Sequence, residues 1–346
     1  MTAAPSQATV GITAVMPVYN GEATLQRSLE PLLAMRERGE IAEIIVVDDG
    51  STDATAKIAS GLGVRVISSG GRLGPGGARN VAAPTAVGGV LWFVDADVVV
   101  HADAARVLAD ALQRTGAAAV FGTYDDDPPA TDFLSQYKNL VHGYYHRREA
   151  GAAETFWAGC GAIRKQAFLE TGGFDGIRYP KPSVEDIELG WRLRQRGLDI
   201  QLVPALQATH LKIWRLKNLL YTEIFLRAIP WSRLIQARGA WSGTLNISRE
   251  ERLRAFLVVC CMFTIALAAA GRAQLWLPAL ILSGVGIANG RLFDFFRRRR
   301  GAMFAFGAVA FHQIYYLYST GAFAWCWMEY RWSAARHALK RSQDAR

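Results

Sequence analysis

One apolar run limits what this chain can fold into. Leu91–Val94 is entirely apolar and is followed at once by two carboxylates, Asp95 and Asp97. A short apolar run without alternation is typical of a strand that is covered on both faces. Alternate residues of an extended chain point to the same side, so the two carboxylates can converge on one cation. A polar turn after a strand would use the same residues, and other parts of the chain must decide between the two interpretations.

The surrounding sequence predicts an α/β fold. Apolar segments alternate with segments of helical periodicity, which is the pattern of βαβ units and a mainly parallel sheet. The expected strands of this part are 10–16, 43–47, 64–68 and 90–94, and the expected helices are 22–35, 54–62 and 103–114. Later segments predict a helix over 132–148, strands over 118–122, 156–163 and 200–203, and a helix that begins near Glu185. In such a sheet, ligands bind beyond the carboxyl ends of the strands.

Composition predicts one α/β domain and a further part. The chain has 346 residues, 51% of them apolar, with a formal net charge of +9. The arginines concentrate in the second half, beside apolar segments, which favours an anionic membrane surface as partner and not nucleic acid. The four cysteines have no metal-ligand spacing and are typical of a reducing compartment. Residues 1–9 lack the pattern of a signal peptide, so we expect residues 10–210 to stay in the cytosol.

The second part of the chain predicts a membrane region. Residues 211–250 form an amphipathic segment suited to the membrane interface, although an ordinary packing helix has the same pattern. Residues 251–330 contain three apolar segments, 255–271, 275–289 and 302–328, which predict two or three transmembrane helices of a cytoplasmic (inner) membrane. Basic groups flank each segment, and residues 331–346 form a basic tail. Three spans would place this tail outside, against the positive-inside rule, so a re-entrant or interfacial third segment stays open.

Five motifs stand in order along the chain. They are Pro17-Val18-Tyr19-Asn20, Asp48-Asp49-Gly50-Ser51-Thr52-Asp53, Gly77-Ala78-Arg79-Asn80, Asp95-Ala96-Asp97 and Glu185-Asp186. Together they resemble the inverting family 2 glycosyltransferases of the GT-A fold, over about residues 10–240. The trailing apolar segments resemble those of membrane-bound members. The resemblance implies a Rossmann-like domain that binds a nucleotide sugar.

The resemblance also implies a donor site. Its residues would be Pro17, Tyr19, Glu22, Asp48, Asp49, Arg79, Asp95 and Ala96. Tyr19 offers an aromatic face, and one of the two adjacent aspartates, 48 or 49, would accept a hydrogen bond from uracil or ribose. Helix capping is the alternative role of that pair. Arg79 can reach a diphosphate as a fixed cation, or it is an ordinary surface charge.

A metal and a catalytic base are implied in the same way. Asp95 and Asp97 would hold Mg²⁺ or Mn²⁺, with Asp97 the more direct ligand, and His210 would be a third ligand, a phosphate contact or a structural residue. Asp186 would be the general base, next to Glu185. The acceptor site would include Trp157, Gly159, Glu185 and Trp191, although a tryptophan here is equally typical of a protein core.

These expectations describe an inverting transferase that moves a sugar from a nucleotide-diphosphate sugar to a membrane-associated acceptor such as a polyprenyl phosphate or a glycolipid. Our first hypothesis for the donor is a UDP-sugar. Glycan extension for an envelope or exported polysaccharide is the alternative. Processive synthases carry a Gln/Arg-x-x-Arg-Trp motif after the base, which Gln236–Trp241 does not match, so a processive polymerase is disfavoured. A non-catalytic, nucleotide-binding membrane scaffold is the remaining alternative.

Overall fold

A computed structural model describes residues 11–238 and 248–344. The chain divides into two compact units, and each is treated by itself. Unit 1 contains residues up to 131 and 146–213, and unit 2 contains 132–145 and 214 onwards. The sequence placed the first boundary at 210, and nothing in the sequence pattern indicated that 132–145 belong with the C-terminal part. The stretch Gln236–Trp241, which does not match the motif of processive synthases, lies partly outside the described residues, and residues 1–9 lie wholly outside them.

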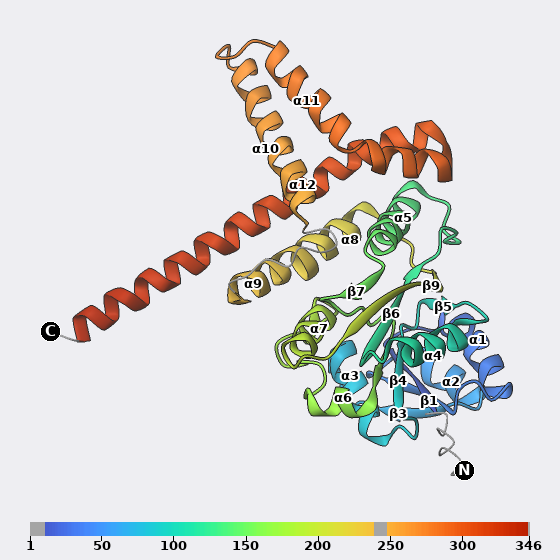
Figure 1. Ribbon diagram of the computed structural model, residues 1–346. Coiled ribbons are helices and arrows are strands. Elements are labelled where there is room, and N and C mark those ends of the chain that lie inside the picture. The colour runs from blue at the N-terminus through green and yellow to red at the C-terminus, as the bar shows by residue number, and fades with distance from the viewer. Residues whose placement is uncertain (1–10, 239–247, 345–346) are drawn as a thin grey trace, which may run out of the picture. The chain divides into compact units, whose positions relative to one another are not determined.

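Unit 1 contains a mixed sheet that includes the strand order β3-β2-β1-β4-β8-β6-β9-β5, with β7 beside β9 (Figure 1). The strands are β1 Ile12–Val18, β2 Glu43–Asp48, β3 Arg65–Ser68, β4 Val90–Val94, β5 Val98–Val100, β6 Ala119–Tyr124, β7 Gly151–Ala153, β8 Cys160–Arg164 and β9 Ile200–His210. The four strands β3, β2, β1 and β4 are mutually parallel, as the sequence predicted. Strand β8 runs antiparallel to both β4 and β6, which ends the first parallel run at β4, and β6 and β9 form a further parallel pair.

Helices cover both faces of this sheet. Those of unit 1 are α1 Leu25–Glu37, α2 Thr55–Gly61, α3 Gly74–Ala82, α4 Ala104–Thr115, α6 Lys165–Glu170 and α7 Glu185–Gln195, with a short 3₁₀ turn at Ala83–Thr85. Residues of α1, α2 and α4 join one core cluster, and residues of α3, α6 and α7 join the other. Because side chains alternate along a strand, Trp92 enters the first cluster while Leu91 and Phe93 enter the second.

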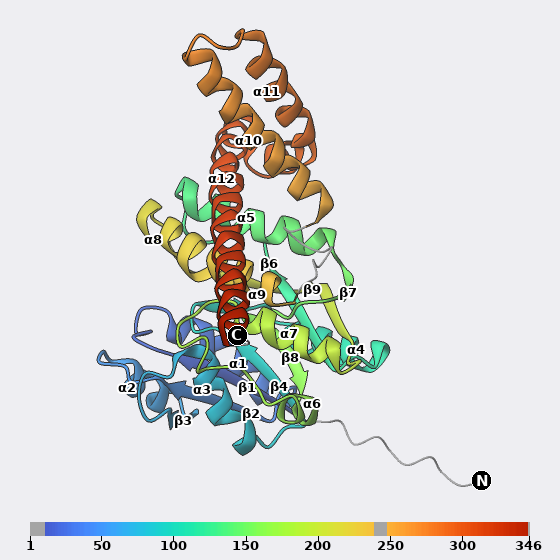
Figure 2. The ribbon, with the colours of Figure 1, turned by 90° about the vertical axis from the view of Figure 1, so that its left-hand side faces the viewer.

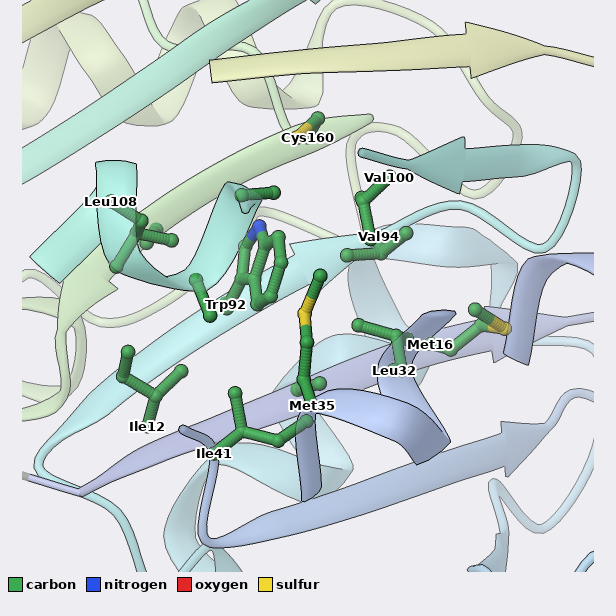
Figure 3. Packing of buried hydrophobic residues seen from close by; sticks show 14 of the residues in the cluster. Ile12, Met16, Leu32, Met35, Ile41, Trp92, Val94, Val100, Leu108 and Cys160 are labelled. Carbon is green, nitrogen blue, oxygen red and sulfur yellow. The ribbon is translucent and has the colours of Figure 1, made fainter. Parts of the chain in front are cut away.

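The packing of the first cluster explains why β4 is apolar throughout. Figure 3 shows the Trp92 indole beside Met35 of α1 and Leu108 of α4. All three side chains are fully buried. Burying an apolar side chain of this size stabilises the fold by about 1.5–3 kcal/mol. The result is a rigid strand whose end, at Asp95, is fixed in position.

Unit 2 is helical. Its helices are α8 Leu216–Tyr221, a π-helical segment Thr222–Ala228, α9 Ile229–Arg238, α10 Arg249–Ala269, α11 Trp276–Ala288 and α12 Gly290–Asp344, with the first residues of α5 Phe133–Arg148 (Figure 2). The amphipathic segment therefore begins to be helical at Leu216 and contains π-helix. Gly301, with φ +84°, breaks α12 near its start.

Only part of the apolar sequence forms helices that are both long and apolar enough to span a membrane by themselves. Within the described residues, α10 alone has the length and composition for a span. A second candidate exists only if α11 and the helix after it, which are bent by 60°, are counted as one broken span. By length and composition, the described residues thus contain one or two candidate spans, where the sequence predicts two or three.

Candidate functional site

The acidic end of β4 is held in place by helix α1. The carbonyl oxygen of Ala96 accepts hydrogen bonds from the hydroxyls of Thr24 (2.8 Å) and Ser28 (3.0 Å). The amide of Asp95 donates to the carbonyl of Gly159 (3.2 Å). These three bonds fix the backbone between the two predicted metal ligands. The role of Ala96 visible here is therefore to position Asp95 and Asp97.

Asp95 and Asp97 have different electrostatic surroundings. Burial raises the pKa of Asp95, and the charges of Asp97 and Asp186 raise it further, although the Arg79 guanidinium acts in the opposite direction. Burial also acts to raise the pKa of Asp97. The hydrogen bond and charge of His210, together with the charge of Lys212, outweigh that effect and lower it. Asp97 is therefore the carboxylate that stays ionised more readily.

Arg79 lies beneath Asp95. Its guanidinium forms an ion pair with Asp95, and its side chain is 3% exposed. The Phe93 and Phe174 rings lie 5.8 Å and 5.4 Å from the guanidinium carbon. A side chain buried in this way orients its carboxylate partner. The direct phosphate contact of Arg79 stays a prediction.

His210 is the last residue of β9, not a residue after that strand. Its Nε2 lies 3.5 Å from Asp97 Oδ2, and its ring stacks on Tyr124 at a centroid distance of 4.4 Å. Tyr124 in turn meets the Trp157 ring edge-on at 4.8 Å. The stack holds the imidazole facing Asp97. Sequence reasoning missed Tyr124, because its partner lies more than eighty residues away.

The carboxylates fit a divalent cation, although His210 does not complete a ligand set. Within residues 11–238 and 248–344, no three His, Cys, Asp or Glu side chains are grouped so that they could hold a metal ion. Asp95 and Asp97 are only two residues apart, and the charge of Asp97 helps to raise the pKa of Asp95. Carboxylate oxygens are the ligands that Mg²⁺ and Mn²⁺ prefer. The metal role of the three residues stays a prediction.

Asp186 and Glu185 begin helix α7. Asp186 Oδ2 accepts a hydrogen bond from the Ala158 amide (3.1 Å), and Oδ1 accepts one from the Ile187 amide (2.8 Å). Glu185 is buried, and burial followed by the charge of Asp186 raises its pKa to about 7. The charge of Asp186 also acts on Asp95. The predicted base and the predicted metal ligands therefore belong to one acidic cluster.

The predicted donor residues near the first strand lie on linked loops. Pro17 is in β1, paired with Val47 of β2. The Tyr19 ring is 41% exposed, and the Arg72 guanidinium lies 3.1 Å from its centroid. Glu22 accepts a hydrogen bond from the Ala54 amide (3.0 Å) and so caps the start of α2. The sequence did not predict a role for Arg72. Its position as a cation inside the glycine-rich segment 70–77 is the signal that could have indicated one.

The predicted acceptor residues surround the start of α7 and β8. Trp157 is half-buried against Tyr124 and His146, so much of its ring already has protein partners. A Cβ on Gly159 would lie 2.6 Å from the Trp157 ring, which explains the small residue there. Trp191 is half-buried on α7. The alternative of a core tryptophan describes Trp157 at least as well as sugar stacking.

This sheet, with its acidic strand end beside a second acidic pair, defines the GT-A class of nucleotide-sugar-binding folds. A solved structure of the same fold is the mannosyltransferase PcManGT from Pyrobaculum calidifontis in complex with GDP-Man and Mn²⁺. It has a TM-score of 0.58 and 18% identity, with 88% of this chain and 86% of that chain covered.

Residues 13–172 match the family model described as glycosyl transferase family 2. The chain thus contains a family 2 glycosyltransferase domain. The succinoglycan biosynthesis protein ExoO of Rhizobium meliloti (strain 1021) is 35% identical over 109 residues, 31% of each chain. A poly-beta-1,6-N-acetyl-D-glucosamine synthase of Staphylococcus aureus (strain COL) is 26% identical over 208 residues, 56% of this chain and 48% of that one. This chain therefore matches less than half the length of either relative.

Proposed function

We propose that the protein is an inverting glycosyltransferase that moves a sugar from a nucleotide-diphosphate sugar to a membrane-associated acceptor. The observation that carries the proposal is that one segment holds both ends of the site: the Ala158 amide binds Asp186 and the Gly159 carbonyl binds the Asp95 amide. The charges of Asp97 and Asp186 both act on Asp95, so the three carboxylates are described as one acidic cluster. A nucleotide sugar needs charge compensation at its diphosphate and a base at the acceptor, and this cluster has residues for both.

The reaction follows from the positions of these groups. Asp186 takes the proton of the acceptor hydroxyl, and the acceptor oxygen forms a bond to the anomeric carbon. The bond from that carbon to the diphosphate oxygen breaks on the opposite face, which inverts the configuration. Asp95 and Asp97 would hold a divalent cation that compensates the charge of the departing nucleotide diphosphate. Arg79 keeps Asp95 oriented throughout.

The acceptor is proposed to be a polyprenyl phosphate or a glycolipid, because unit 2 exposes large apolar side chains along α10 and α11. A UDP-sugar is the proposed donor. Extension of an envelope or exported glycan is a second candidate, favoured by the similarity to a succinoglycan biosynthesis protein and a poly-beta-1,6-N-acetyl-D-glucosamine synthase. A screen of nucleotide sugars in membranes, followed by mass analysis of the lipid product, distinguishes transfer to a lipid acceptor from glycan extension.

The first test is hydrolysis or transfer by the purified protein with each nucleotide sugar, with and without Mn²⁺. No turnover and no binding with any donor would leave a non-catalytic scaffold as the better description. Asp186→Asn is the matched variant, because the amide keeps the size of the side chain. We expect transfer to a hydroxyl acceptor to fall by about 10²–10⁴-fold, as general base catalysis is lost. Nearly unchanged turnover would argue for a phosphate acceptor, which needs little base assistance.

A further inference from the structure

Helix α12 carries an exposed apolar stripe for most of its length. Trp327 and Tyr330, near the end of the helix, are also exposed but face other directions. The remaining exposed large side chains are Met303, Phe306, Ile314, Trp325, Met328 and Trp332, and they are 41–90% exposed. At 3.6 residues per turn, these positions fall on one side of the helix. The stripe extends over 30 residues, or about 45 Å at 1.5 Å per residue. An exposed apolar stripe of this size needs a partner.

Polar contacts within unit 2 lie along one edge of the apolar stripe on α12. Tyr318 donates a hydrogen bond to Glu223 (3.1 Å), which also forms an ion pair with Lys138 (2.7 Å). Glu329 receives both Arg233 donors, at 3.1 and 3.2 Å. Polar partners are therefore distributed along the helix and are not confined to its ends.

From these observations we infer that α12 lies along the membrane surface, with its apolar stripe against the lipid, and does not cross the bilayer. The C-terminus then stays on the same side as residues 11–213. This inference rests on the membrane part of the proposed function and names the surface that meets the lipid. It does not depend on which sugar is transferred.

The charges of unit 2 make a crossing unfavourable. The middle of the apolar stretch 302–328 is residue 315, three positions before Tyr318. A crossing helix would bring Glu223 and Lys138 close to the bilayer centre, where charged side chains are costly even when they pair with each other. An in-plane helix keeps them at the level of the headgroups. Tryptophan and tyrosine, which are frequent on α12, also prefer that level.

The flanking charges agree with an in-plane helix. Arg297–Arg300 precede the break at Gly301, and Arg331 and Arg336 lie on either side of Trp332, the last residue of the stripe. With α12 in the plane, both groups lie near one set of anionic headgroups. For the C-terminus to stay on that side, the hairpin of α10 and α11 must also enter and leave there, and its flanking basic residues then face the same headgroups. The conflict with the positive-inside rule, which three spans create, disappears.

The first experiment compares the two ends of the full chain. One epitope tag is placed before Met1 and another after Arg346, and protease access is measured in sealed vesicles of defined orientation. We expect both tags to be cut, or both protected, in the same preparation. Tags on opposite sides would overturn the inference.

The second experiment measures immersion depth along the stripe. Spin labels are attached singly at Met303→Cys, Ile314→Cys and Met328→Cys, after the four native cysteines are replaced by serine, in vesicles with anionic lipid. Leu280→Cys on α11 is the control, because it is 62% exposed on the apolar hairpin. Thermal unfolding and gel filtration of the cysteine-free parent check that it remains folded.

We expect the three stripe labels to lie at similar depths, about 5–10 Å into the headgroup and acyl boundary, with the control deeper. Ile314 much deeper than both Met303 and Met328 would mean a crossing helix. No immersion at any position would remove the lipid partner altogether. Donor hydrolysis is measured separately on the same protein. It shows whether the proposed glycosyl transfer fails together with the inference on α12.

Discussion

Asp48 and Asp49 are adjacent and chemically identical, yet their surroundings differ. Asp49 is buried and accepts hydrogen bonds from the Ser69 hydroxyl (2.8 Å), the Leu73 amide (2.8 Å) and the Gly74 amide (2.9 Å). Asp48 is half-buried, and its Oδ1 accepts from the Ser51 amide (3.0 Å). Asp49 therefore fixes the glycine-rich loop, and we assign the donor contact to Asp48.

The two asparagine variants test this assignment at the residue scale. Asp49→Asn places an amide donor against backbone N–H groups, so we expect the free energy of unfolding to fall by about 1–3 kcal/mol. Asp48→Asn should leave stability within about 0.5 kcal/mol and raise the donor KM. Chemical denaturation and donor kinetics measure the pair. The opposite pattern would assign the donor contact to Asp49.

The pKa of Glu185, raised to about 7 by burial and by Asp186, predicts a pH dependence of stability. The folded state holds a proton that the unfolded state releases near the ordinary pKa, so this group favours folding at low pH. Its contribution is lost as the pH rises from about 4.5 to 7. In Glu185→Gln we expect this part of the decline in unfolding free energy to disappear. Unfolding curves recorded between about pH 4.5 and 7 measure it. An unchanged slope would contradict the prediction.

At the scale of elements, β6 and β9 approach each other closely where their register shifts, between Phe121 and Thr123. A Cβ on Gly122 would lie 1.9 Å from the Leu206 carbonyl oxygen, which belongs to the backbone and cannot swing away. This junction lies two residues before Tyr124, which stacks on His210. The glycine thus allows the strands to converge near the site.

Gly122→Ala should separate these strands. We expect a loss of about 1–3 kcal/mol of unfolding free energy from overpacking, together with reduced transfer activity as Tyr124 shifts. Gly61→Ala is the control, because a Cβ there meets nothing within 4 Å, and an added methyl in helix α2 should be neutral or stabilising. Equal effects of the two substitutions in thermal unfolding would refute the packing argument.

The acidic cluster could be predicted from sequence because each motif is local. Asp95 and Asp97 follow a strand whose apolar run is unmistakable, and Asp186 begins a helix. The Arg72–Tyr19 stack and the Tyr124–His210 stack could not be predicted, because they depend on loops and strands that meet only in the folded chain. Periodicity also could not indicate that β8 runs antiparallel to β4, since a buried strand has the same pattern in either direction.

At the scale of the whole chain, unit 2 combines a segment of α5 with helices more than a hundred residues later. Glu251 is 2% exposed and accepts hydrogen bonds from Tyr145 (2.9 Å) and Tyr316 (2.8 Å), and it forms an ion pair with Arg254. The carboxylate is therefore the point at which three distant segments meet. Such a residue cannot be recognised by local spacing.

Replacing this carboxylate should loosen unit 2. In Glu251→Gln the charge that compensates Arg254 is removed from a buried position, and removing one partner of a buried pair typically costs about 3–5 kcal/mol. Glu250→Gln is the matched control, because the Glu250 side chain is 54% exposed and surface pairs contribute at most about 1 kcal/mol. Unfolding of the full chain in detergent, followed by tryptophan fluorescence, compares the two variants. If they unfold alike, the Glu251 network does not hold the segments of unit 2 together.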